Sequence, residues 1–300
     1  MKKLLLLFVL LGTACAMDLV GSYSGFINAQ KCFPNVDYLY LLDRYSLFAF
    51  DITEPSTPVK IDSLVTSGYV LNLALSDDYA FLGSGNSLIV LDISDAGHPV
   101  QTGSISLGAT DQARGVAYCD GYVYLAGMNV FKIYEFSAPS TLTEVYSEIY
   151  STASVDAEGD YAAIGVSSVG GGGVWVFDIT DPSSPTILPG GPTTGSAVDV
   201  DIDDGRIYIA DGAEVGIGTG HVLLMLTSAL GSFIGTFSST DGDCQHGCAY
   251  NSQYLVANGN DGFILLDWSV PEFPEIIDNY TLSPGAYAQD ANIQYPYIYG

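Results

Sequence analysis

The sequence predicts an all-β protein, a β-propeller of four-stranded blades, because two strand-rich phrases alternate along the 300-residue chain. The first phrase is an apolar strand ending in Asp, a turn containing Ser or Thr and Pro, and a second strand. The second phrase is a short strand, a tight turn and a Tyr-rich strand. A period of about 40–50 residues in an all-strand pattern is typical of propeller blades. Copies of the first phrase occupy residues 46–65, 87–107, 130–149, 173–190, 221–237 and 262–282.

The position that ends the first strand, usually Asp, recurs at a nearly constant interval. It falls at Asp51, Asp92, Glu135, Asp178, Met225 and Asp267, which are 41, 43, 43, 47 and 42 residues apart. At most of these positions Ser or Thr follows two residues later, before a Pro. An Asp carboxylate in this place can accept backbone N–H groups across the turn. We therefore expect these residues to hold the turn together rather than to form a binding site.

Each repeat holds four strands, a to d, from the channel outward, and one domain covers residues 17–300. The repeats run over residues 32–72, 73–115, 116–154, 155–199, 200–247 and 248–290, with a partial repeat at 291–300. Residues 18–32 align with a d-strand and the loop that follows it, so the N-terminal strand is expected to close the last blade. This predicts seven blades with the chain truncated inside the seventh. A six-bladed ring with a short overhang is the alternative.

The N-terminus has the features of a secretory signal peptide over residues 1–16. Lys2 and Lys3 precede an apolar run at 4–11, and Ala14-Cys15-Ala16 fits cleavage after Ala16. The run is too short for a permanent membrane anchor, and no later segment is long and apolar enough to span a bilayer. We expect a secreted, periplasmic or cell-surface protein. A lipoprotein acylated at Cys15 is the alternative.

The net charge and the cysteine content limit the kinds of ligand and cofactor that we expect this protein to bind. The chain carries 34 acidic and 8 basic residues, a net charge of −26, which disfavours nucleic acid as a partner. Solubility explains this charge, while calcium binding is left open and no other cofactor is expected.

Export permits disulfides, and Cys244 and Cys248 could close a short loop. Free thiols, or zinc bound with His246 and His221, are the alternatives.

The phrases SLIVLDISDAGHPV at 87–100 and GVWVFDITDPSSP at 173–185 resemble LVIVD repeats, found in exported bacterial and archaeal β-propellers. The resemblance covers nearly all of residues 18–300 and departs from the pattern at Glu135 and Met225. It implies the propeller fold, a place outside the cell or on its surface, and a binding or adhesion role. The family has no common catalytic motif, so the resemblance assigns no active site.

Candidate binding residues come from the irregular positions between the repeats. In a propeller the starts of the inner strands and the loops before them surround one mouth of the channel. Aligning the repeats places a mixed set of charges there: Lys31, Arg114, Asp156, Asp199, Asp201, His246 and Asp290. These side chains could form a solvated rim, a ligand or cation site, or an acid–base set.

No catalytic motif emerges from the sequence, so we expect a binding protein rather than an enzyme. The predicted function is an exported, monomeric binding or cell-surface interaction module with a protein or carbohydrate ligand. The alternative is a propeller hydrolase or lyase with its site at the channel mouth.

Overall fold

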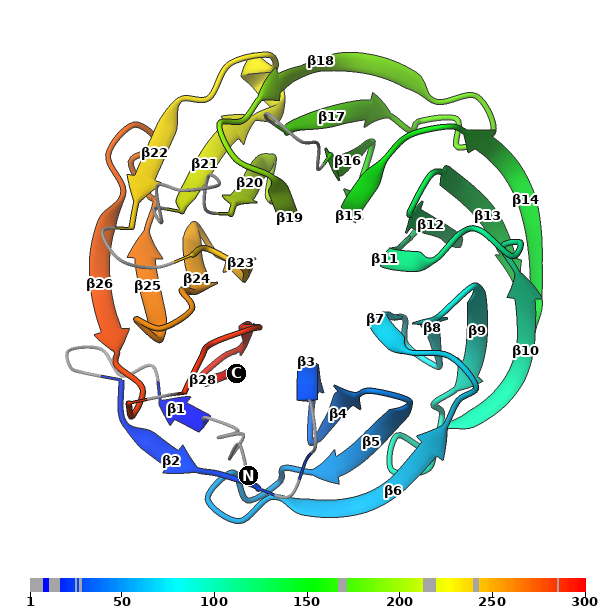
Figure 1. Ribbon diagram of the computed structural model, residues 1–300, viewed down its shortest axis with the longest axis horizontal. Coiled ribbons are helices and arrows are strands. Elements are labelled where there is room, and N and C mark those ends of the chain that lie inside the picture. Colours follow the sequence, from blue (N-terminus) through cyan, green and yellow to red (C-terminus); the bar gives the residue numbers. More distant parts are fainter. Residues whose placement is uncertain are drawn as a thin grey trace.

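The computed structural model is a ring of four-stranded antiparallel sheets around a central channel (Figure 1). It describes residues 8–10, 17–24, 26, 29–166, 172–212, 220–239, 243–284 and 286–300. Six sheets are built from four consecutive strands each and are called blades 1 to 6. The first strand of each blade borders the channel and the fourth lies at the outer rim. The predicted all-β propeller with four-stranded blades is confirmed.

Blades 1 to 3 follow one another along the chain in the order a, b, c, d. Blade 1 consists of β3 (Ala29–Asn35), β4 (Tyr38–Asp43), β5 (Ser46–Asp51) and β6 (Val59–Val65). Blade 2 consists of β7 (Val70–Leu75), β8 (Tyr79–Ser84), β9 (Ser87–Asp92) and β10 (Val100–Ser106). Blade 3 consists of β11 (Ala113–Cys119), β12 (Tyr122–Gly127), β13 (Phe131–Ser137) and β14 (Thr141–Glu148).

Blades 4 to 6 repeat the pattern. Blade 4 consists of β15 (Thr152–Glu158), β16 (Tyr161–Val166), β17 (Gly173–Asp178) and β18 (Thr186–Pro192). Blade 5 consists of β19 (Ala197–Asp203), β20 (Arg206–Asp211), β21 (His221–Leu226) and β22 (Gly235–Ser238), with the short 3₁₀ helix η1 (Thr227–Ala229) before β22. Blade 6 consists of β23 (His246–Tyr250), β24 (Gln253–Ala257), β25 (Phe263–Asp267) and β26 (Glu275–Tyr280).

Both ends of the chain meet in a further four-stranded sheet. Its order is β2 (Leu19–Gly21), β1 (Phe8–Leu10), β28 (Tyr297–Tyr299) and β27 (Asn292–Gln294). The expected N-terminal closing strand is therefore present as β2, but it pairs with β1 rather than directly with the C-terminal strands. We call this sheet the composite sheet. It lies between blades 6 and 1, where the sequence predicts a seventh blade (Figure 1). The described residues therefore form six blades of four consecutive strands, not the seven that we predicted, and this additional sheet.

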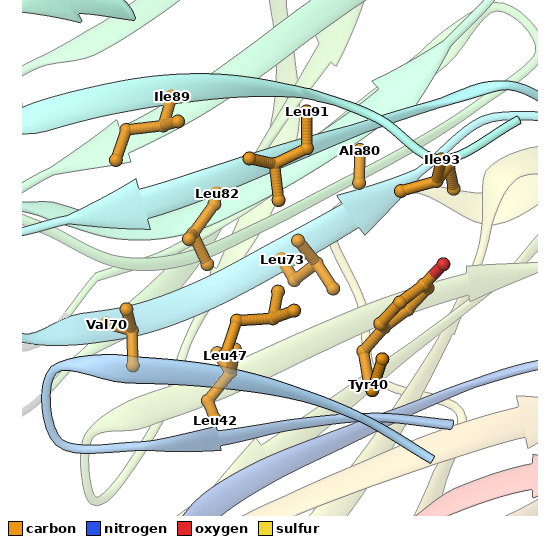
Figure 2. Packing of buried hydrophobic residues seen from close by; sticks show 11 residues of the cluster. Tyr40, Leu42, Leu47, Val70, Leu73, Ala80, Leu82, Ile89, Leu91 and Ile93 are labelled. Atoms are coloured by element: carbon orange, nitrogen blue, oxygen red, sulfur yellow. The ribbon is translucent and has the colours of Figure 1, made fainter. Parts of the chain in front are cut away.

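The b and c strands bury both of their faces, which explains their nearly continuous apolar sequence. In β9, Ile89 and Leu91 pack toward blade 1, whereas Leu88 and Val90 pack toward blade 3. Figure 2 shows the first of these clusters, where Leu42 and Leu47 of blade 1 meet Leu73 and neighbouring residues of blade 2. One such cluster lies between every pair of adjacent sheets, including the composite sheet.

The recurrent Asp closes the turn between strands c and d, as the sequence predicts. The Asp92 carboxylate accepts hydrogen bonds from the backbone N–H of Ser94 at 2.9 Å and from its hydroxyl at 2.6 Å. The same pair of bonds joins Asp51 to Thr53 and Asp178 to Thr180, and the backbone bond joins Asp267 to Ser269. Hydrogen bonds from Ser94 lower the pKa of Asp92, because they favour the charged carboxylate.

These turns pack against the outer strand of the preceding sheet, where glycine makes room for them. A Cβ atom on Gly235 would lie 2.1 Å from the carbonyl oxygen of Pro271 in the blade 6 turn. A Cβ atom on Gly21 of β2 would lie 2.0 Å from the carbonyl oxygen of Pro55 in the blade 1 turn. The composite sheet thus contacts blade 1 in the same way that blade 5 contacts blade 6.

The predicted signal peptide lies outside the described residues except for 8–10, and Cys15 lies outside them. Within the described ranges, the structure has no helix long and apolar enough to cross a membrane.

Replacing Gly235 with Ala is expected to lower the free energy of unfolding by about 1–3 kcal/mol, because the added methyl group overpacks the contact with Pro271 and Trp268. Urea unfolding followed by Trp fluorescence measures the change. Thr236→Ala, at the next and exposed position of β22, is the control and should change stability by less than about 0.5 kcal/mol. Equal effects of the two substitutions would contradict the close contact.

Candidate functional site

The central channel widens into a cavity of about 270 Å³ that is lined by residues of all seven inner segments. Blades 2 and 3 contribute mainly apolar groups, among them Leu73 and Val116. The charged groups come from blades 4 and 5, from the segment that leads into β27, and from blade 1. They are Asp156, Asp199, Asp201, Asp290 and Lys31. One half of the channel is therefore acidic with a single lysine, and the other half is nearly neutral.

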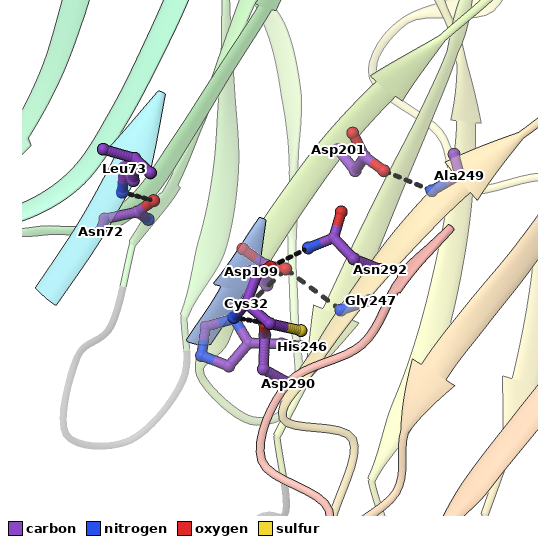
Figure 3. Close-up of polar contacts among 10 residues, drawn as sticks. All are labelled: Cys32, Asn72, Leu73, Asp199, Asp201, His246, Gly247, Ala249, Asp290 and Asn292. Atoms are coloured by element: carbon purple, nitrogen blue, oxygen red, sulfur yellow. Dashed lines mark hydrogen bonds and ion pairs between the residues drawn. The ribbon is translucent and has the colours of Figure 1, made fainter. Parts of the chain in front are cut away.

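Three channel carboxylates lie on inner strands whose inward edges have no neighbouring strand to pair with, and Asp290 lies just before β27. Each carboxylate accepts a backbone N–H from the next blade, so it replaces part of the missing ladder. Asp156 of blade 4 accepts from Ile202 of blade 5 at 2.7 Å. Asp201 of blade 5 accepts from Ala249 of blade 6, as Figure 3 shows. The acidic residues thus connect adjacent blades as well as line the cavity.

A similar connection joins the composite sheet to blade 1 through side chains at alternate positions. Asp290 accepts the N–H of Cys32 at 2.8 Å, and the Asn292 amide donates to the carbonyl of Cys32 at 2.9 Å (Figure 3). The Gln294 side-chain oxygen accepts the N–H of Val36 at 2.8 Å. Because the three residues are spaced two apart, their side chains lie on one side of the segment, toward β3.

Asp156 of blade 4 and Asp201 of blade 5 are carboxyl groups that hydrogen-bond to each other. Burial raises the pKa of Asp201 well above its usual range, and the negative charge of Asp156 adds to this effect. Burial also raises the pKa of Asp156, although hydrogen bonds from Asp201 and the backbone partly oppose the shift. The pair therefore shares a proton at pH values where exposed carboxyl groups are ionised.

Asp199 lies in the same channel, but its pKa is lowered rather than raised. Burial alone would raise its pKa, yet the neighbouring His246, the charge of Lys31 and the N–H of Gly247 together lower it. His246 Nδ1 lies 3.3 Å from Asp199 Oδ2, and the Gly247 N–H donates to the same carboxylate at 3.2 Å (Figure 3). Asp199 is therefore ionised at neutral pH.

The structure brings together six of the seven residues that the sequence predicts for the channel mouth. Lys31, Asp156, Asp199, Asp201 and Asp290 line the cavity, and His246 contacts Asp199. Arg114 does not line it, because its guanidinium turns toward blade 4 and donates to the carbonyl of Thr152 at 3.4 Å. Ligand binding by these residues remains a prediction.

Cys244 and Cys248 are separate thiols in this structure, so the disulfide between them is not formed. Cys244 is buried in the cluster between blades 5 and 6, and its thiol donates to Asn258 at 3.6 Å. Cys248 instead packs in the cluster between blade 6 and the composite sheet. The two side chains point to opposite faces of blade 6, which explains why the short spacing in sequence does not bring the sulfur atoms together.

None of the four described thiols is activated. Burial raises the pKa of Cys244 to about 12, and burial likewise raises the pKa of Cys32, Cys119 and Cys248. A thiol with a raised pKa is a weak nucleophile near neutral pH. Among the residues that the structure describes, no three His, Cys, Asp or Glu side chains are arranged to hold a metal ion.

The sequence reasoning missed Asn292 and Gln294, which join the composite sheet to blade 1. The spacing Asp290, Asn292, Gln294 carries a signal for them, since three polar residues at alternate positions interrupt an otherwise apolar strand pattern. Their partners on β3 could not be found this way, because the sequence does not indicate which strand edge lies opposite.

Comparison with protein families gives a match to the LVIVD repeat at three consecutive places, residues 67–106, 111–152 and 149–188. These stretches cover all four strands of blades 2 and 3 and most of blade 4, including the c–d turns closed by Asp92 and Asp178. A comparison with curated protein sequences finds no match.

Solved structures confirm the fold class at low sequence identity. U3-55K aligns with a TM-score of 0.73 and 12% identity, covering 90% of this chain and 86% of that chain. The WD40 repeats of RRP9 align with a TM-score of 0.70 and 11% identity, covering 97% and 88%. The computationally designed Ika8 protein aligns with a TM-score of 0.68 and 10% identity, covering 94% and 86%. At such identities the likeness shows the propeller fold alone.

Asp201→Asn is expected to stabilise the protein at neutral pH by more than the roughly 0.5 kcal/mol typical of surface substitutions. The raised pKa of Asp201 means that the folded state resists losing this proton. Stability should therefore fall in the wild type as pH rises from the unfolded-state pKa of about 4 to the folded-state pKa. Asn keeps an acceptor for Ala249 and removes this decline. Urea unfolding between pH 3 and pH 8 measures the effect.

Asp199→Asn, on the same strand, is the matched control, and it should change the stability at neutral pH in the opposite direction. Because the pKa of Asp199 is lowered, its stabilising contribution is present above about pH 4 and is lost as pH falls through the folded-state pKa. This variant should be less stable than the wild type at neutral pH. If the stability of the two variants changed with pH in the same way, this would contradict a shared proton at Asp156 and Asp201 and an ionised carboxylate at Asp199.

Proposed function

We propose that this LVIVD-repeat β-propeller is an exported, non-enzymatic binding module whose ligand occupies the acidic half of the central channel. The asymmetric charge of the channel supports this proposal, since carboxylates of blades 4 and 5 and of the segment before β27 face a nearly neutral opposite wall. A positively charged group on a partner protein is the ligand chemistry that such a wall favours. A carbohydrate ligand is the alternative within the same role.

The bonding of the channel carboxylates supports binding rather than catalysis. Asp156, Asp199, Asp201 and Asp290 each accept a backbone N–H from the neighbouring blade, so their positions are held rigidly. Rigid carboxylates on several strands suit recognition of a fixed cation, because little conformational entropy is lost when the ligand binds. The predicted signal peptide supports export, and β2 supports a seven-bladed ring in the exported protein.

Titration calorimetry with hexalysine in 0.15 M salt is expected to give saturable binding at the channel, with hexaglutamate as the negative peptide control. The double variant Asp156→Asn with Asp199→Asn should bind at least about tenfold more weakly, a loss of about 1.4 kcal/mol. The control variant Asp77→Asn with Asp181→Asn removes at least as much negative charge from exposed turns and should bind as the wild type does. Equal losses in both variants would mean that hexalysine responds only to net charge.

The second candidate function is a hydrolase or lyase at the channel mouth. The His246–Asp199 pair beside two carboxyl groups with raised pKa values favours it, because such groups often serve in acid–base catalysis. The inter-blade hydrogen bonds of the carboxylates count against it.

If this alternative holds, a screen of ester, phosphoester and glycoside substrates should find turnover that His246→Gln lowers at least about a hundredfold, as expected for loss of an acid–base group. The binding proposal instead expects no turnover above that of the His246→Gln protein. The matched control is His98→Gln, since His98 lies exposed in the blade 2 turn.

A further inference from the structure

The residue that follows the predicted cleavage point is anchored between blade 6 and the composite sheet. Met17 is only 6% exposed, and its side chain packs with Phe263 and Leu265 of blade 6 and with Ile298 of β28. Its backbone N–H donates a hydrogen bond to the Asp278 carboxylate. The first residue after Ala16 therefore has both its side chain and its nitrogen held by the neighbouring elements.

Asp278 is placed to receive that nitrogen. It lies on β26, the outer strand of blade 6, opposite Leu265 of β25. Its Oδ1 atom accepts the N–H of Asn279 at 2.8 Å, which fixes the carboxylate, and its Oδ2 atom faces Met17. The other titratable groups near Met17 are Cys248 and Tyr280, which pack against the same cluster, and Asp18, which follows in the chain.

We propose that removal of the signal peptide after Ala16 creates an α-ammonium group at Met17 that forms an ion pair with Asp278 and fastens the N-terminal strand to blade 6. The inference depends on the proposed export but not on any channel ligand. Cleavage is a hydrolysis in which water adds its hydroxyl to the Ala16 carbonyl and a proton to the Met17 nitrogen. The amine then takes up a further proton, since α-amino groups have pKa values of about 7.7–8.0.

Cleavage strengthens the hydrogen bond between Met17 and Asp278, which already exists in the uncleaved chain. A hydrogen bond from a neutral peptide N–H becomes one from an ammonium group to a carboxylate, which is about twice as strong as a neutral bond. The change matters because cleavage also removes β1 from its place between β2 and β28. The N-terminal strand is then held by Met17 against blade 6 and by the contact of Gly21 with the blade 1 turn.

The test uses the full-length chain expressed in an exporting bacterial host. N-terminal sequencing of the purified product should begin at Met17, and an unprocessed chain or a different first residue would overturn the proposal. Asp278→Asn removes the charge of the partner. The matched control is Asp62→Asn, because Asp62 occupies the equivalent place on blade 1, opposite Ala49, with its Oδ1 atom accepting the N–H of Ser63 at 2.7 Å.

The readout is the rate at which an acylating reagent modifies the α-amine between pH 6 and pH 10. The ion pair raises the amine pKa, so Asp278→Asn should acylate at least about twofold faster at pH 7.5, the change expected for a pKa difference of about half a unit. Asp62→Asn should react as the wild type does. A wild-type amine pKa at or below about 8.0, measured without any variant, would overturn the proposal even if Asp278→Asn fails to fold.

Unfolding measurements give a second readout with a defined sign. An amine whose pKa is raised in the folded state stabilises the protein fully below about pH 7.7, and this contribution is lost as pH rises through the folded-state pKa. The wild type and Asp62→Asn should lose stability over this range, and Asp278→Asn should not. Failure of hexalysine binding would leave these outcomes unchanged, so the two proposals are separable.

Discussion

Every blade has two apolar faces, and the rest of the structure depends on covering both. A four-stranded sheet of this kind is stable only between two neighbours, because an uncovered face would expose a row of Leu, Ile, Val and aromatic side chains to water. The ring satisfies this condition at each interface, with one apolar cluster between adjacent sheets. The composite sheet follows from the same need, since without it blades 6 and 1 would each leave one face uncovered.

Acidic residues serve two structural purposes at different radii of the ring. At the periphery, Asp51, Asp92, Asp178 and Asp267 accept N–H groups within their own turns. In the channel, carboxylates accept N–H groups from the next blade, where the inner strands have no further strand to pair with. The peripheral groups are partly exposed, so water screens their charges. The channel groups are enclosed, which is why Asp201 has a raised pKa and Asp199 depends on His246.

This arrangement limits what the channel can do. Each carboxylate that lines the cavity also takes part in holding two blades together, so recognition and stability are coupled at the same atoms. A ligand cation would meet oxygens whose positions are already set by backbone partners. Lys31 keeps part of the acidic wall neutralised, and its charge acts on Asp199. The chemistry of the channel therefore belongs to the arc that runs from blade 4 through the composite sheet to blade 1.

The sequence by itself determined the strands, the period and the role of the recurrent Asp, because these depend on local hydrogen bonds and on alternation within a few residues. It also placed Lys31, Asp199 and Asp290 at one level of the channel, since the repeats align position by position. Only the tertiary structure decided which side chains meet. It separated Arg114 from the channel, placed Cys244 and Cys248 on opposite faces of blade 6, and brought Met17 to Asp278. Those outcomes depend on which strand edges lie opposite each other once the ring closes, and that is set by packing across blades far apart in the chain.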